Sequence, residues 1–125
     1  MNYNQCPIIR TLEVFGGKWK PLLLYYLAEQ PRRAGELLKL LPQASSKVIT
    51  QQLRELERDG IVLRTVHRQV PPRVDYTLSK HGASLAPLLR EMCKWGRAHP
   101  RPDAKEDFVS PARKGLLRLD SRRQA

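Results

Sequence analysis

The stretch SSKVITQQLRELERDGIV, residues 45–62, decides the fold of this chain. Ser45 or Ser46 can cap the start of a helix here, and Gly60 can end it. Three apolar residues recur at helical spacing and define one face: Ile49, Leu53 and Leu56. The stretch therefore predicts an amphipathic helix over residues 46–59.

The side of this helix opposite the apolar face carries groups suited to nucleic acid. Four residues at positions i, i+3, i+4 and i+7 lie there: Lys47, Thr50, Gln51 and Arg54. Lys and Arg can donate to guanine and Gln can pair with adenine, and each good pair discriminates between bases by about 1–3 kcal/mol. The free N–H groups at a helix start favour phosphate, and the hydroxyls of Ser45 and Ser46 add to them. Any soluble amphipathic helix has a polar side, so the interpretation depends on the neighbouring segments.

Three further helices are expected upstream, over about residues 7–15, 18–29 and 33–41. The second of them is apolar on most of its sides, which predicts a central, covered position. The third is joined to helix 46–59 by a short turn. Two helices joined in this way are a candidate helix-turn-helix.

Downstream of residue 60 the period of apolar residues changes from 3.6 to 2. This change predicts two strands, over about residues 61–67 and 74–78. The basic loop RQVPPR joins them into a hairpin. Arg68 and Arg73 flank its tip, where a wing would reach a neighbouring minor groove or the phosphate backbone.

A long helix over about residues 79–98, kinked by Pro87, follows the hairpin. This order of elements is that of a winged helix-turn-helix, a mainly α fold with a small β-hairpin wing (α+β). We expect residues 1–99 to form one DNA-binding domain. Residues 100–125 are basic and proline-rich without sustained periodicity, and we expect a disordered tail there.

The bulk composition narrows the possible partners. A chain of 125 residues with 41% hydrophobic residues fits one domain with a modest core. Its net charge of +11 attracts polyanions, which makes nucleic acid the leading partner class ahead of an anionic membrane surface. Cys6 and Cys93 are too few for a disulfide framework, and no signal peptide or membrane span is visible. We therefore expect a cytoplasmic protein that does not associate with membranes.

The sequence offers no arrangement that predicts an enzyme, a metal site or a cofactor. It shows no nucleophile–base pair and no paired carboxylates, and its three histidines are scattered: His67, His81 and His99. Glu55 and Glu57 have the spacing of helix-surface charges that pair with Arg54 or Arg58. We expect no catalytic residues, no metal and no cofactor.

Several segments carry a resemblance to a known family. CPIIRTLEVFGGKWKPLLLYYL, the stretch at 45–62, VPPRVDYTLSKHG and MCKWG together resemble the HxlR-type bacterial transcriptional regulators, which are winged helix-turn-helix proteins related to the MarR group. The resemblance covers about residues 5–99. It implies that helix 46–59 is the recognition helix and that residues 68–73 form the wing.

The resemblance also implies a homodimer that represses, or sometimes activates, nearby genes. Dimer contacts would come from the first helix and the long last helix, around Ile8, Leu12, Leu89, Met92 and Trp95. Such a dimer would bind a pseudo-palindromic operator in double-stranded DNA, with half-sites about 10 base pairs apart.

Cys6 is the candidate for sensing a signal. It precedes Pro7 at the expected helix start, where the positive end of the helix dipole favours a thiolate. It also matches the N-terminal cysteine of the resembled family, which in several members senses oxidants or electrophiles. The alternative is a small buried residue that packs against its dimer mate. For Cys93, beside the apolar stripe of the last helix, a core or interface role is expected.

The sequence thus favours a dimeric, sequence-specific DNA-binding regulator, a repressor rather than an activator, with Cys6 as the candidate through which an oxidant or small electrophile would act. The alternative is a general basic nucleic-acid-binding or architectural protein without a signal response. The two differ in whether unrelated DNA sequences bind with comparable affinity.

Overall fold

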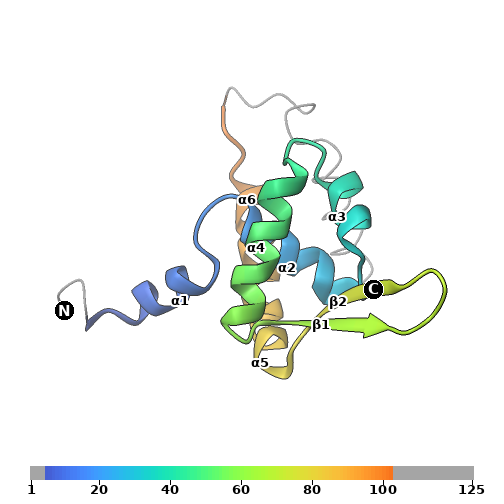
Figure 1. Ribbon diagram of the computed structural model, residues 1–125. Helices are drawn as coiled ribbons and strands as arrows, with labels where there is room; N and C mark the ends of the chain where they lie inside the picture. Colours follow the sequence, from blue (N-terminus) through green and yellow to red (C-terminus); the bar gives the residue numbers. More distant parts are fainter. Residues whose placement is uncertain (1–4, 103–125) are drawn as a thin grey trace.

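The computed structural model describes residues 5–102. The expected basic tail, apart from residues 100–102, therefore lies outside the described part of the chain. The elements follow one another in the order α1 (Pro7–Phe15), α2 (Trp19–Glu29), α3 (Ala34–Leu40), α4 (Ser46–Arg58), β1 (Val62–His67), β2 (Arg73–Leu78), α5 (Lys80–Ala83) and α6 (Ala86–Ala98) (Figure 1). This is a winged helix-turn-helix, as the sequence predicts.

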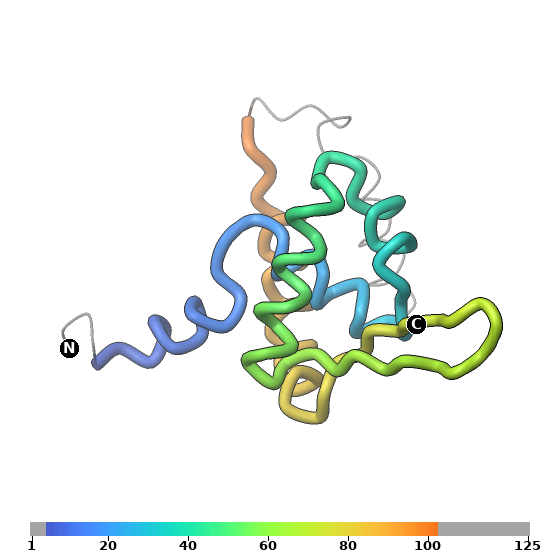
Figure 2. The backbone as a smooth tube through the Cα atoms, viewed as in Figure 1, coloured from blue at the N-terminus to red at the C-terminus, as the bar shows by residue number. Residues whose placement is uncertain are grey.

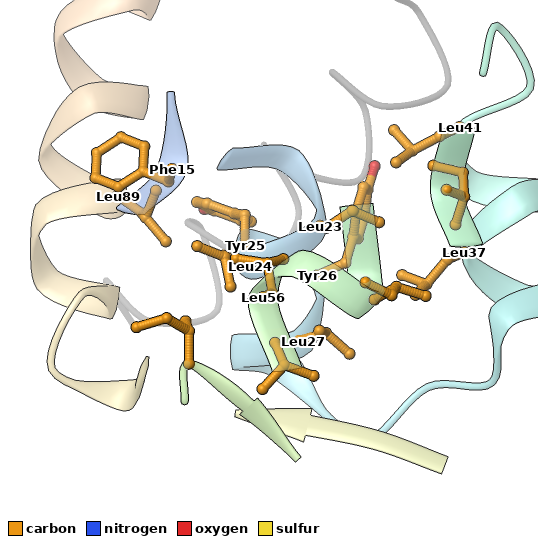
Figure 3. Close-up of a cluster of buried hydrophobic side chains, with 14 of the residues drawn as sticks. Phe15, Leu23, Leu24, Tyr25, Tyr26, Leu27, Leu37, Leu41, Leu56 and Leu89 are labelled. Carbon is orange, nitrogen blue, oxygen red and sulfur yellow. The ribbon is translucent and has the colours of Figure 1, made fainter. Parts of the chain in front are cut away.

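The core is built around α2. All five residues from Leu23 to Leu27 are buried, which confirms that this helix is covered on most sides (Figure 3). The apolar face of α4 packs against it, and Ile49, Leu53 and Leu56 are fully buried. Fully burying such a side chain contributes about 1.5–3 kcal/mol. The depth of these three residues fixes which side of α4 faces the solvent.

The helix-turn-helix consists of α3, the turn at 41–45 and α4. The Oγ of Ser45 accepts a hydrogen bond of 3.1 Å from the backbone N–H of Val48, so Ser45 is the N-cap of α4. At the other end of α4, Gly60 has a φ of 75°, a left-handed conformation that favours glycine. These two residues set the length of α4 close to the predicted 46–59.

The wing is the antiparallel hairpin of β1 and β2, in which Val66 is paired with Val74. The opposite edge of β2 is tied to the segment that leads into α3. Arg32 donates its N–H to the carbonyl of Tyr76 at 3.0 Å and accepts from the N–H of Tyr76 at 2.8 Å. Because Arg32 is itself buried and pairs with Glu29 at 3.2 Å, the base of the wing is anchored to the end of α2.

The prediction of one long helix after the wing is wrong. The structure has two helices, α5 and α6, separated by a turn in which Leu85 donates its N–H to Gly82 at 3.0 Å. Pro87 has no N–H to offer the carbonyl of Ala83, and its ring would collide with that carbonyl in a continuous helix. Pro87 instead occupies the first turn of α6, where a missing N–H costs nothing.

Helix α1 extends away from the body of the molecule, on the side opposite the wing (Figures 1 and 2). Only Val14 and Phe15, at its C-terminal end, are buried. Phe15 and Leu89 of α6 lie at one end of the buried cluster (Figure 3). The remainder of α1 packs little against its own chain.

Candidate nucleic-acid interface

The polar side of α4 faces the solvent, as its buried apolar face requires. Lys47, Gln51 and Arg54 are exposed, and Thr50 is half-buried at the margin. The predicted side chains therefore share one accessible surface, and they do not belong to the core. Side chains of these types bind base edges and phosphates in protein–DNA complexes.

The N-terminus of α4 adds backbone donors to this surface. Ser45 and Ser46 are both exposed at the helix start. The Ser45 oxygen already accepts from Val48, but its hydroxyl proton remains available to an acceptor. The first N–H groups of a helix lack internal partners and favour an anion.

Arg58 belongs to the same surface and was not among the residues chosen from the sequence. It is exposed and follows Arg54 by four positions, so it continues the row toward the C-terminal end of α4. Its Nε lies 3.7 Å from the carboxylate of the adjacent Asp59. The i, i+4, i+7, i+11 spacing from Lys47 is the signal that could have found it.

In the wing, the two arginines differ in their surroundings. Arg68 is exposed beside the tip, where Val70 is 99% exposed. Arg73 is half-buried as the first residue of β2, and its guanidinium lies 3.3 Å from the Oδ2 of Asp75. The same oxygen lies 2.9 Å from the Nε2 of His67. Arg68 is therefore presented outward, while Arg73, at the loop end of β2, is held by an ion pair with Asp75.

An ion pair joins α2 to α4. The Nζ of Lys20 lies 3.1 Å from the Oε1 of Glu55, and Lys20 is buried. The predicted surface pairing of Glu55 with Arg54 or Arg58 is therefore wrong. Because Lys20 and Glu55 are far apart in the sequence, no local spacing rule could have matched them.

Apolar side chains remain exposed on α1 and α6. Four of the five residues predicted to contact a dimer mate are among them: Ile8, Leu12, Met92 and Trp95. Leu89 differs, because it is only 4% exposed and belongs to the core of its own chain. Leu88, one position earlier on α6, is 40% exposed and was missed. At 100° per residue, Leu88 shares the outward side with Met92 and Trp95.

The two cysteines are free thiols in different settings. Cys6 is the N-cap residue of α1 and is half-buried. Cys93 is half-buried against the core, and the guanidinium of Arg97 donates to its Sγ at 3.4 Å. The two thiols thus lie on the two elements that carry the exposed apolar residues.

Within residues 5–102, no group of three or more His, Cys, Asp or Glu side chains is arranged to hold a metal ion. In the same part of the chain, no helix has the length and apolarity needed to cross a membrane.

The family follows from sequence comparison. A profile described as HxlR-like helix-turn-helix matches residues 14–104. The chain belongs to the HxlR family. Membership makes the protein a DNA-binding transcriptional regulator rather than an enzyme.

Two relatives from Bacillus subtilis (strain 168) are named as uncharacterized HTH-type transcriptional regulators. YtcD is 51% identical over 89 residues, which cover 71% of this chain and 71% of that protein. YkvN is 47% identical over 114 residues, which cover 89% of this chain and 97% of that protein.

Solved structures of transcriptional regulators superpose closely on this chain. The redox regulator HypR in its oxidised form has a TM-score of 0.74 and 43% identity, covering 77% of this chain and 99% of that one. Its reduced form has a TM-score of 0.72, also with 43% identity, covering 74% and 92%. The reduced form of the transcriptional regulator YodB from B. subtilis has a TM-score of 0.67 and 31% identity, covering 80% and 99%.

Proposed function

We propose that this protein is a dimeric, sequence-specific transcriptional regulator that inserts α4 into the major groove of double-stranded DNA. The observation that carries the proposal is the orientation of α4, whose apolar face is fixed against the core. With Ile49, Leu53 and Leu56 fully buried, Lys47, Gln51 and Arg54 have no orientation except outward. The wing, with Arg68 near its tip, would contact the backbone or minor groove beside that site.

The exposed apolar residues support a dimer formed through α1 and α6. Trp95 is 66% exposed and Ile8 is 65% exposed, an unfavourable arrangement for an isolated chain. A second copy would cover both, together with Leu12, Leu88 and Met92. Leu89 would support this surface from below. Two copies related by two-fold symmetry would bind half-sites of a pseudo-palindrome about 10 base pairs apart.

We favour repression over activation as the role of this dimer. Occupying DNA that overlaps a promoter blocks transcription without any further surface on the protein. Activation needs, in addition, a surface that binds the transcription machinery. We place the end of the DNA-binding domain near residue 99, with residues 100–125 as an appended basic segment.

We further propose that Cys6 responds to an oxidant or electrophile. HypR is named a redox regulator and is solved in oxidised and reduced forms, and YodB is solved in a reduced and a diamide-treated form. In this chain Cys6 caps α1, the helix whose outer residues would contact the partner subunit. A modified thiol at this cap would change how α1 packs on the second copy, and so the spacing of the two α4 helices.

The test is a titration with DNA from upstream of the protein's own gene and its neighbours, against scrambled DNA of equal length. It is run at near-physiological salt, with and without a mild thiol oxidant. The proposal predicts at least about a thousandfold preference for one fragment, within the range of specific DNA-binding proteins. Robust, equal binding to every genomic fragment would favour a general nucleic-acid binder.

The same titration with Cys6→Ser and Cys93→Ser tests the sensor. An oxidant effect in the parent and in Cys93→Ser, absent in Cys6→Ser, is the expected result. An undiminished effect in Cys6→Ser would remove Cys6 from this role.

A further inference from the structure

Lys20 lies in α2, outside the helix-turn-helix, yet it reaches the recognition helix. Its side chain is 11% exposed, that of Glu55 is 27% exposed, and their charged atoms are 3.1 Å apart. The other oxygen of Glu55, Oε2, accepts from the Nε2 of Gln52 at 3.5 Å. A polar chain of three residues therefore links α2 to one flank of α4.

The flank of α4 that carries Glu55 adjoins the surface that would face DNA, so the ion pair with Lys20 lies close to the residues that would read bases. At 100° per residue, Glu55 lies about 40° around the helix from Gln51, and Gln52 lies between Glu55 and the core side. Thr50 is on the opposite flank, about 140° from Glu55. The ion pair is thus at one edge of the surface that would face DNA.

The buried residues of α4 restrain its rotation through apolar packing. Its buried residues on this side are all aliphatic, and apolar burial is not directional. A roll of α4 about its own axis by about 10° would move side-chain atoms, about 5–6 Å from that axis, by about 1 Å. An ion pair with defined geometry on one flank opposes such a roll.

We propose that Lys20 is a positioning residue for operator discrimination: by holding Glu55, it fixes the rotation of α4 so that Gln51 and Arg54 meet base edges. The inference rests on the proposed function, in which α4 reads DNA. Contacts to base edges depend on a particular donor–acceptor geometry, whereas long cationic side chains follow a shifted phosphate. Loss of the pair should therefore lower discrimination more than general affinity.

The decisive quantity is the ratio of affinities for the operator and for scrambled DNA at one salt concentration. Partial unfolding of a variant lowers both affinities by the same factor, so the ratio does not register a purely structural role. An unpaired Glu55 carboxylate that merely repelled phosphates would also weaken both affinities alike. Only an altered presentation of the base-reading side chains changes the ratio.

The experiment compares the parent with Lys20→Met, Lys20→Arg, Glu55→Gln and the double variant Lys20→Met/Glu55→Gln. We expect Lys20→Met to reduce the ratio by about tenfold and Lys20→Arg, which can keep the ion pair, to retain most of it. The double variant should lose little more than the more affected single variant, because both changes remove the same contact. Lys94→Met on α6 is the matched control: it removes the same charge from an exposed site and should leave the ratio unchanged.

A ratio in Lys20→Met within twofold of the parent, an equal loss in Lys94→Met, or additive losses in the double variant would overturn the inference. If Lys20→Met does not fold, Glu55→Gln decides, and an unchanged ratio there overturns it as well. A parent protein that prefers no fragment would overturn the proposed function itself. A preference that survives loss of the pair overturns only the role of Lys20.

Discussion

The Nε2 of His67 lies 2.9 Å from the Oδ2 of Asp75 across the wing hairpin. The same oxygen holds the guanidinium of Arg73 at 3.3 Å, and the Asp75 side chain is only 18% exposed. A carboxylate therefore lies near the loop end of the element that would approach phosphate. Its charge offsets that of Arg73, which would limit the attraction of the wing for DNA.

Replacing Asp75 with Asn should strengthen binding to all DNA sequences alike. The amide keeps the shape of the side chain but no longer offsets Arg73, so one more cation becomes available to phosphate. The slope of log affinity against log salt should become steeper by up to about 0.9. Glu91→Gln, the same change in charge at an exposed site on α6, should leave the slope unaltered; equal slopes in Asp75→Asn and the parent would contradict this account.

Lys47→Ala and Arg68→Ala should each make the salt dependence shallower, by about 0.9 in slope if each side chain neutralises one phosphate. Both residues are exposed, one near the start of α4 and one beside the wing tip. Binding isotherms between about 50 and 200 mM salt give the slope. Lys94→Ala serves as the control. If Lys47→Ala and Lys94→Ala have the same slope, Lys47 does not contact the phosphate backbone of the DNA.

Arg54→Ala should lose discrimination rather than general affinity alone. If its guanidinium donates to a guanine, the operator should lose about 1–3 kcal/mol of preference over a site with that base pair changed. The measurement is a panel of single base-pair substitutions in the operator, titrated with parent and variant. If the variant and the parent show the same order of affinities across the panel, Arg54 contacts the DNA backbone and not a base.

Trp95→Glu should dissociate the dimer. A buried, unpaired carboxylate in an apolar interface costs several kcal/mol, whereas the same side chain on a monomer remains hydrated. Sedimentation equilibrium should show the parent as a dimer and the variant as a monomer at the same concentration. Lys94→Glu, a new carboxylate on the more polar side of the same helix, should remain dimeric, and a dimeric Trp95→Glu would move the interface elsewhere.

Gly82→Ala should be among the most destabilising single changes in the domain. A Cβ at this position would collide with the backbone carbonyl of Ile61, which also accepts from the N–H of Ser79 at 2.9 Å. Gly35→Ala, in a helix and with open space around its Cβ, should instead stabilise by about 0.5–1 kcal/mol. Denaturant unfolding at one protein concentration compares them, and equal stability of the two variants would contradict the close approach of α5 to Ile61, the residue before β1.

Much of the fold follows from local pattern. The helical spacing of Ile49, Leu53 and Leu56 predicts α4. The serine and glycine at its ends predict its length. The exposed positions of Lys47, Gln51 and Arg54 follow from the same pattern, because burial of one helix face dictates the other. These features depend on residues within one or two turns of each other.

The features that the sequence did not predict depend on contacts between residues far apart in the chain, or on two local signals that oppose each other. Lys20 and Glu55 meet only because α2 and α4 pack together. Leu89 has the spacing of an interface residue, but its burial near Phe15 is decided by the path of α1 (Figure 3). The break before α6 arises because the apolar stripe favours one continuous helix, whereas Pro87 is tolerated only in the first turn of a helix.

The central claim is that a dimer reads two half-sites through α4. Its most direct test is to titrate the protein with the operator, with the operator carrying five extra base pairs between its half-sites, and with scrambled DNA. Five base pairs rotate one half-site by about half a helical turn, so a rigid dimer could engage only one of them. The account predicts tight binding to the intact operator and a large loss with the insertion, toward the affinity for scrambled DNA. Equal affinity for all three would contradict it.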